Sequence, residues 1–207
     1  MKVAYLTFDD GPARYTGAIL DQLREHGVKA TFFVLGNRTP KGIRLYKRMV
    51  QEGHAIGNHT FSHNYPVIYS SISAFLKDFR KLESLLQRYV HVKPKIFRFP
   101  GGSQNAVNPL YGNRAQMTKV NQVMTRRGYR YFDWNVESGD SEIPRPTTEA
   151  MIRNVLRGSK NKRKIIVLFH DFNPNTPKCL PAVIKGLRRQ GFRFQVLSKK
   201  SFTVRFR

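Results

Sequence analysis

The chain has 207 residues, of which 40% are hydrophobic and 12% aromatic, enough apolar side chain for one full hydrophobic core. No run of 18 or more apolar residues occurs, so the sequence predicts no membrane span, and the single cysteine, Cys179, excludes an internal disulfide. The 37 Lys and Arg residues outnumber the 13 Asp and Glu residues, and the resulting formal net charge of +24 predicts attraction to polyanions.

Apolar, β-branched or aromatic runs alternate with segments of helical period along the whole chain. The expected strands are residues 3–8, 30–35, 55–58, 96–99, 129–136, 164–169 and 192–197. Between them lie expected helices at residues 16–26, 41–52, 71–89, 114–127, 147–157 and 180–190. Several of these helices stop at a glycine, the residue that most readily adopts the left-handed C-cap conformation: Gly27, Gly53, Gly128, Gly158 and Gly191.

Regular alternation of strand and helix predicts a parallel sheet covered by helices. About seven parallel strands in a chain of this length favour an α/β fold, a closed or nearly closed (β/α) barrel, and a single domain over residues 1–207. The initial stretch "MKVAYLTF" is expected to be the first strand, because it lacks the layout of a signal peptide. The longest irregular piece, residues 101–113, is expected to serve a site.

Polar side chains of catalytic type collect where the expected strands end. In parallel α/β folds the functional site forms at the carboxyl ends of the strands, so these side chains are expected at one rim. They are Asp9 and Asp10 after the first strand, His59 and His63 after the third, Arg98 at the fourth, Asp133, Trp134 and Asp140 after the fifth, and His170 and Asp171 after the sixth.

His59 and His63 are four residues apart, and on a helical turn this spacing places both imidazoles where they can bind one metal ion. A carboxylate from the first strand end would complete a set of two His and one Asp, which leaves metal positions open for water and substrate. One of the adjacent Asp9 and Asp10 can be that ligand, while the other stays free to act as a base. Taken alone, "DDG" is equally typical of a plain turn.

Five motifs in order, "TFDDG", "HTFSH", "RFPGG", "DWNVESGD" and "VLFHD", resemble those of the polysaccharide deacetylases, carbohydrate esterase family 4 or the nodulation-B homology domain. The resemblance spans residues 3–197. It implies a distorted (β/α) barrel and hydrolysis of an acetyl group on a polysaccharide. By this resemblance Asp10, His59 and His63 bind one divalent metal, zinc first, with cobalt, nickel or manganese as alternatives.

The same resemblance implies that Asp9 is the general base, that Arg98 pairs with it, and that His170 is the general acid. Asp140 aligns with the aspartate that orients this histidine; Asp133 is the alternative, because Ser141 follows Asp140 where many members have tryptophan.

For substrate binding, the match implies a backbone N–H of Gly101 for the oxyanion and Leu168 against the acetyl methyl group. Trp134 and Tyr111 are candidates for stacking on sugar rings, although aromatic residues also serve as core. A purely structural role is the alternative for Arg98 and Leu168.

The expected activity is metal-dependent removal of N-acetyl groups from GlcNAc-type residues of a cell-wall polysaccharide, peptidoglycan before chitin. The alternatives are an O-acetyl xylan esterase of the same family, an inactive glycan-binding domain and a polyanion-binding protein. The expected partners are the acetylated polysaccharide and, through the basic surface, anionic cell-wall polymers. Nucleic acid is not expected, because no zinc-finger, basic-heptad or RNP motif occurs. A location in the cell envelope or outside the cell follows from this activity, and the chain is expected to be a monomer.

Overall fold

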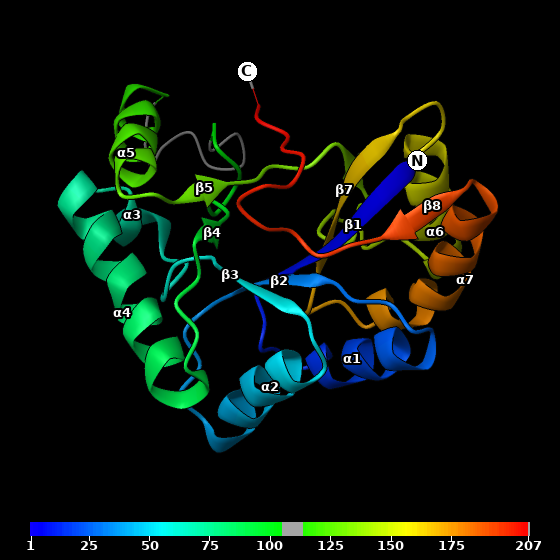
Figure 1. Ribbon diagram of the computed structural model, residues 1–207, viewed down its shortest axis with the longest axis horizontal. Helices are drawn as coiled ribbons and strands as arrows, with labels where there is room; N and C mark the ends of the chain where they lie inside the picture. Colours follow the sequence, from blue (N-terminus) through cyan, green and yellow to red (C-terminus); the bar gives the residue numbers. More distant parts are fainter. Residues whose placement is uncertain (105–113, 207) are drawn as a thin grey trace.

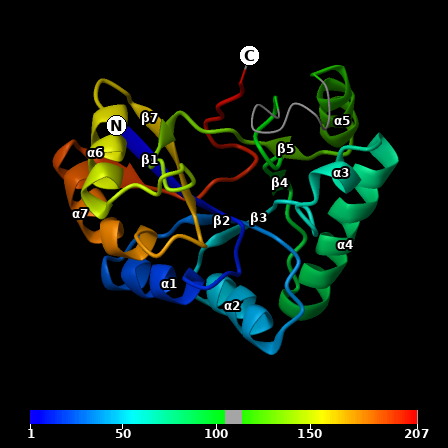
Figure 2. The ribbon, with the colours of Figure 1, turned by 180° about the vertical axis from the view of Figure 1, so that it is seen from behind.

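The computed structural model describes residues 1–104 and 114–206, and its centre is one β-sheet in which the strand pairings of the described residues are parallel (Figures 1 and 2). The order of the hydrogen-bonded strands is β5-β4-β3-β2-β1-β7-β6, and β8 pairs with β1 beside this path. The strands are β1 (Lys2–Asp9), β2 (Thr31–Val34), β3 (Ala55–Asn58), β4 (Ile96–Phe97), β5 (Arg130–Tyr131), β6 (Val136–Glu137), β7 (Lys164–His170) and β8 (Phe192–Phe194).

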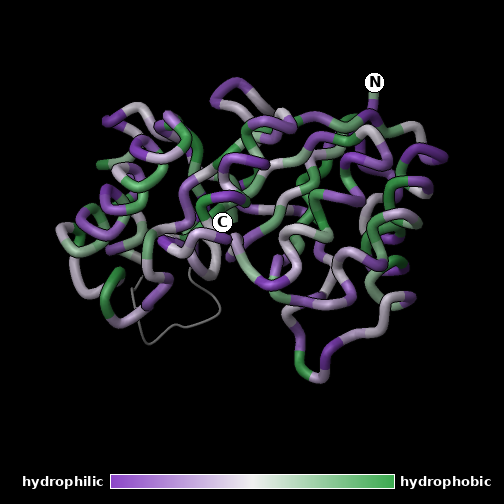
Figure 3. Tube along the Cα trace, turned by 90° about the horizontal axis from the view of Figure 1, so that it is seen from below, coloured by the Kyte–Doolittle hydropathy of each residue, from purple (hydrophilic) through white to green (hydrophobic). Residues whose placement is uncertain are grey.

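Helices surround the outer face of this curved sheet, and hydrophobic and hydrophilic residues alternate along them (Figures 1 and 3). Three of them start at a side-chain cap: the side chains of Thr39, Ser71 and Thr147 each accept a hydrogen bond from a backbone N–H of the first turn. No helix in the described part of the chain is long and apolar enough to cross a membrane. The helices are α1 (Thr16–Glu25), α2 (Pro40–Gln51), α3 (Tyr65–Ile68), α4 (Ile72–Val90), α5 (Arg114–Arg126), α6 (Thr148–Gly158) and α7 (Thr176–Arg189).

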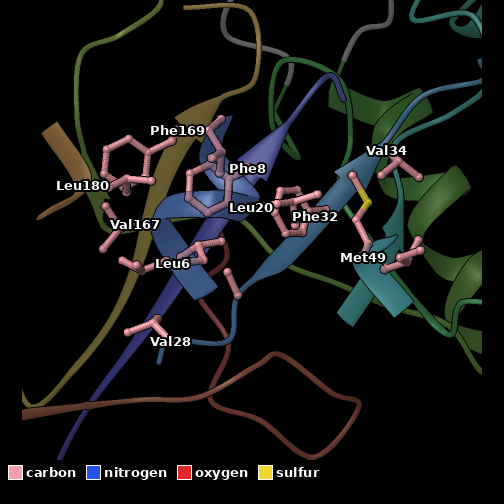
Figure 4. Packing of buried hydrophobic residues seen from close by; sticks show 14 of the residues in the cluster. Leu6, Phe8, Leu20, Val28, Phe32, Val34, Met49, Val167, Phe169 and Leu180 are labelled. Atoms are coloured by element: carbon pink, nitrogen blue, oxygen red, sulfur yellow. The ribbon is translucent and has the colours of Figure 1, made fainter. Parts of the chain in front are cut away.

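Alternation along β1 and β7 separates two cores. Leu6 and Phe8 of β1 and Phe169 of β7 belong to the cluster between sheet and helices, where Phe8 stacks on Phe169 at a ring-centroid distance of 5.4 Å (Figure 4). Val3 and Tyr5 of β1 belong to the cluster inside the barrel. Because successive side chains of a strand point to opposite faces, Thr7 and Asp9 continue the inner row of β1 toward the rim.

One side of the barrel is closed by irregular chain instead of strand pairing. β5 and β6 are the two ends of the strand order. The segment 195–206, which follows β8, crosses the inside of the sheet and then runs between β5 and β7 in Figures 1 and 2. Leu197 is part of the inner core, and the N–H of Asp133 donates to the carbonyl of Val204 at 3.0 Å. This segment therefore supplies the contacts that a neighbouring strand would make.

The predicted α/β barrel of parallel strands is confirmed, with differences in detail. The short helix α3 was not expected, and β4 and β8 are shorter than the expected strands 96–99 and 192–197. The expected strand 129–136 is two short strands, because the chain leaves the sheet between β5 and β6. The last helix begins at Thr176, four residues before the expected start, and contains Pro181 in its interior. Gly158 is not a C-cap: it lies inside α6, and Ser159 caps that helix.

Candidate active site and metal centre

The carboxyl ends of the strands surround one pocket with a volume of about 330 Å³. The charged residues among its described lining are all acidic or histidine, which contrasts with the basic character of the whole chain. The lining residues are Asp9, Asp10, His59, His63, Tyr65, Phe99, Gly101, Trp134, Glu137, Gly139, Asp140, Ser141, Glu142, Leu168, His170 and Phe172.

Asp9 ends β1 and is ion-paired with a fully buried arginine. Nη1 of Arg98 donates to Oδ1 of Asp9 at 2.8 Å and to Oγ1 of Thr7 at 2.8 Å. One guanidinium nitrogen therefore binds both of these side chains on the inner face of β1. Burial raises the pKa of Asp9, and the charge of Arg98 opposes that rise. The pair gives a carboxylate that faces the pocket and is held in one orientation.

Asp10, His59 and His63 form a group that fits a divalent metal. Oδ1 of Asp10 lies 3.5 Å from Nε2 of His59 and 3.4 Å from Nε2 of His63. Tetrahedral ligands about 2.0–2.1 Å from zinc would lie roughly 3.3–3.4 Å apart, close to these separations. The three ligand atoms all lie within 4.8 Å of one another.

The chemistry of these donors also fits a cation. Oδ1 of Asp10 is buried and accepts no hydrogen bond from any residue that the structure describes, so its charge is uncompensated there. Nδ1 of His59 lies 2.8 Å from the carbonyl oxygen of Arg98, which leaves Nε2 for a metal. Burial lowers the pKa of His59 to about 3, so its ring is neutral, the form that binds metal.

The backbone is strained at two of these three residues. Asp10 has φ of 73° and His63 has φ of 53°, and few residues other than glycine adopt this left-handed region. Such outliers persist when surrounding contacts hold them, and they concentrate at functional sites. Gly11, the next residue after Asp10, lies close to Asp171: a Cβ there would lie 2.0 Å from Oδ2 of Asp171, so only glycine allows this close approach.

His170 ends β7 directly beside Asp9, because the two residues are register partners on neighbouring strands. Its Nδ1 lies 2.7 Å from Oδ1 of Asp140, and its backbone N–H donates to Oδ2 of the same carboxylate at 2.6 Å. Burial alone would lower the pKa of His170, but the hydrogen bond and charge of Asp140 outweigh it and raise this pKa to about 9. At neutral pH the ring is therefore protonated.

The two candidate orienting aspartates lie in different places. Asp140 holds His170, and its Oδ2 also accepts from Oγ1 of Thr176 at 2.9 Å. Asp133 accepts hydrogen bonds from Ser103 and Phe206 instead.

The structure places three of the four predicted substrate-binding residues in the pocket lining: Gly101, Leu168 and Trp134. Tyr111 lies outside the described residues. Sequence reasoning missed Glu137, Glu142 and Phe172, which also line the pocket. Glu137 lies within the fourth motif, "DWNVESGD", and Glu142 follows its last residue, Asp140, by two positions. Phe172 follows "VLFHD" directly, so proximity to the motifs was the available signal.

Asp171 is a further buried residue beside the site whose contacts the sequence did not indicate. Its N–H donates to the carbonyl of Asp9 at 3.0 Å, and its Oδ2 accepts from Oγ1 of Thr16. Burial raises the pKa of Asp171 to about 8. Asp171 therefore ties the end of β7 to the loop that carries Asp10.

Known proteins share this sequence and this fold. Residues 1–120 match the model of the polysaccharide deacetylase family. A peptidoglycan-N-acetylglucosamine deacetylase of Bacillus cereus is 32% identical over 209 residues, which cover 99% of this chain and 73% of the relative. The deacetylase PgdA of Listeria monocytogenes is 30% identical over 196 residues, but these cover 38% of that longer protein and 94% of this chain.

Solved structures agree with the sequence matches. The catalytic domain of a peptidoglycan N-acetylglucosamine deacetylase from Eubacterium rectale superposes with a TM-score of 0.94 at 35% identity, covering 100% of this chain and 93% of that one. A polysaccharide deacetylase from Bacillus cereus gives 0.86 at 31% identity, covering 100% and 97%. The resemblance seen in the five motifs is thereby confirmed: the chain belongs to the polysaccharide deacetylase family, carbohydrate esterase family 4.

Proposed function

We propose that the protein is a metal-dependent hydrolase that removes the N-acetyl group from N-acetylglucosamine residues of peptidoglycan. The observation that carries this proposal is the arrangement of Asp9 and His170. They are register partners on β1 and β7, they have opposite charge, and both line the pocket that contains Asp10, His59 and His63. The names of the Bacillus cereus, Listeria and Eubacterium relatives support peptidoglycan as the substrate.

Asp10, His59 and His63 are the residues that would hold the cation. A divalent metal bound there would polarise the acetyl carbonyl and lower the pKa of water, which is otherwise a poor nucleophile at neutral pH. Zinc suits two imidazoles and one carboxylate, and the neutral state of His59 favours its binding.

Asp9 is proposed as the general base that takes the proton of the attacking water. Its Oδ1 is occupied by Arg98, while Oδ2 lies 3.7 Å from Nε2 of His59, on the side of the ligand group. The guanidinium keeps the carboxylate ionised before the reaction. A general base of this kind typically contributes about 10²- to 10⁴-fold to the rate.

His170 is proposed as the general acid that protonates the leaving nitrogen. Without this proton the amine would be expelled as an amide anion, and attack on the carbonyl would reverse. Asp140 keeps the imidazole charged through its 2.7 Å contact with Nδ1, which leaves Nε2 as the nitrogen that donates. Near the acetyl group, the N–H of Gly101 would donate to the oxyanion, and Leu168 would pack against the methyl group.

Acetate release from three substrates tests the proposal: peptidoglycan, N-acetylated glucosamine oligomers and acetylated xylan, each with and without a chelator. Release from the first two that stops with chelator and returns with zinc is the expected result. Release from xylan alone would indicate an O-acetyl esterase, and no release from any substrate would indicate a glycan-binding protein. Activity of this kind would place the protein in the cell envelope or outside the cell.

A further inference from the structure

The side chain of Asp133 connects three segments that are far apart in the sequence. Its Oδ1 accepts from the N–H of Ser103 at 2.8 Å, and its Oδ2 accepts from Oγ of Ser103 at 2.6 Å and from the N–H of Phe206 at 2.8 Å. Asp133 has no exposed surface, so these bonds satisfy a buried carboxylate. The turn after β4, the end of β5 and the segment 204–206 are thus held at one point.

Phe206 lies against the pocket aromatic residue Trp134. The two rings are perpendicular, with an interplanar angle of 82° and a centroid distance of 4.8 Å. Both rings cover Gly102: a Cβ there would lie 2.9 Å from Cε2 of Phe206 and 3.2 Å from Cη2 of Trp134. The close packing therefore depends on the absence of a side chain at position 102.

Other contacts hold the rest of the Trp134 ring. Cζ of Arg98 lies 5.4 Å from its centroid, and its Nε1 donates to Oε1 of Glu137. Arg98 also binds Asp9, the proposed base. The orientation of Trp134 is consequently set between the catalytic ion pair and Phe206, and no motif identified in the sequence includes Phe206.

We propose that Phe206, anchored by Asp133, is a positioning residue for substrate: it fixes the ring of Trp134 as the pocket wall on which a sugar of the glycan packs. Edge-to-face aromatic contacts favour one relative orientation, so Phe206 limits the ring positions open to Trp134. A wall fixed before binding lowers the entropic cost of holding an oligosaccharide. This inference rests on the proposed deacetylase function and adds a specificity element to it.

Trp134 is the only tryptophan in the sequence, so the fluorescence of the protein reports directly on the environment of this ring. In Phe206→Ala we expect red-shifted emission and about twofold stronger quenching by acrylamide. Affinity for a tetramer of N-acetylglucosamine, titrated through the same emission, should fall about tenfold. In acetate release from the tetramer, KM should rise by a similar factor while kcat changes less than threefold, and hydrolysis of a small aryl acetate should stay unchanged.

Phe206→Tyr keeps the ring and should restore both emission and affinity. Arg205→Ala changes an exposed residue of the same segment and is the matched control, with wild-type values expected. Melting temperatures for every variant establish that each is folded. Asp133→Asn keeps one acceptor oxygen for the three donors of Ser103 and Phe206, so it weakens this anchor and should shift the emission in the same direction in a folded protein.

Two results would overturn the proposal. One is Phe206→Ala protein with unchanged Trp134 emission and tetramer affinity; the other is an equal loss of activity on the tetramer and the aryl acetate. A wild-type protein that does not bind the tetramer would also overturn it, because Trp134 would then be no sugar-binding wall. Wild-type protein that binds the tetramer but releases no acetate contradicts only the deacetylase function, since the binding titration still decides the role of Phe206.

Discussion

Two ion pairs in the pocket have nearly the same geometry and opposite chemical consequences. Nη1 of Arg98 lies 2.8 Å from Asp9, and Nδ1 of His170 lies 2.7 Å from Asp140. In the first pair the cation is the deeper partner: the side chain of Arg98 is 0% exposed and that of Asp9 is 4%. In the second pair the carboxylate is deeper, with Asp140 at 1% and His170 at 14%.

In the proposed mechanism, one kind of contact prepares a base in the first pair and an acid in the second. In each pair the charge of the deeper partner stabilises the opposite charge on the partner nearer the pocket. A fixed guanidinium favours an ionised Asp9, whereas a fixed carboxylate favours a protonated His170. Because β1 and β7 are paired along their length, the two prepared groups reach the rim side by side.

Removing a ligand of the proposed metal should have the largest effect, because both steps that the metal would assist depend on it. In His63→Ala, metal content should fall well below one ion per chain and activity should fall by about 10⁴-fold or more, since polarisation and water activation are both lost. Elemental analysis and acetate release measure these quantities. His91→Asn, an exposed histidine whose left-handed backbone asparagine tolerates, is the control. Full metal occupancy with normal activity in His63→Ala would show that the site is misassigned.

Asp9→Asn breaks the first pair and leaves the second. The amide has nearly the same size but cannot take a proton, so kcat should fall by about 10²- to 10⁴-fold while bound metal remains. Elemental analysis beside steady-state kinetics separates this outcome from metal loss. Near-normal turnover in this variant would make Asp9 a structural partner of Arg98 and remove the proposed base.

Asp140→Asn tests the second pair through pH. As the proposed general acid, His170 must be protonated, and its pKa is raised to about 9, so wild-type activity should be lost as pH rises through that value. Loss of the Asp140 charge lowers this pKa, and the alkaline limb should move to lower pH. Turnover should then be about tenfold lower at pH 8 but within about threefold of wild type at pH 6.

The matched control for this shift is Glu142→Gln, which removes one negative charge from the pocket lining but not the hydrogen bond to His170. It should move the limb much less. In His170→Ala the limb attributed to this histidine should disappear. An unshifted limb in Asp140→Asn would mean that another group controls the alkaline side of the profile.

The smallest expected effect concerns the basic surface of the chain, which contrasts with the acidic pocket. The +24 charge should attract anionic wall polymers at long range, and salt screens this attraction with a Debye length of about 8 Å at physiological strength. Sedimentation with isolated walls should therefore weaken steeply as salt rises. Turnover of a short neutral oligosaccharide should change less than about twofold over the same series. Binding to walls that stays unchanged as the salt concentration rises would contradict an electrostatic role for the basic surface.

The inner and outer rows of β1 and β7 were predictable, since alternating apolar residues and polar strand ends are local properties of the sequence. The rim position of Asp9 and His170 followed from the rule that parallel strands end at one edge. The sequence did not predict the break between β5 and β6, because aromatic and β-branched residues continue across it. The buried carboxylate of Asp133 finds its partners 30 and 73 positions away, and no local pattern encodes such contacts.

The same reason explains the other omissions. Asp171 adjoins His170 in sequence, yet its hydrogen bond from Thr16 spans 155 positions. The last helix was expected to start at Leu180, whereas it begins at Thr176, whose Oγ1 donates to Oδ2 of Asp140, 36 positions away. Tertiary contacts, not propensity, decided these boundaries.

Complete burial of Arg98 joins catalysis to folding. Its Nε donates to the carbonyl of Phe132 at 2.9 Å and its Nη2 to that of Asp133 at 3.3 Å, in addition to Thr7 and Asp9 on β1. An arginine remains charged whether the chain is folded or not, so it leaves water only when all these acceptors are in place. β1, β4 and β5 must therefore come together in one cooperative step. Loss of activity during denaturation should accordingly coincide with loss of the whole fold, because Asp9, the proposed base, loses its guanidinium partner when these strands separate.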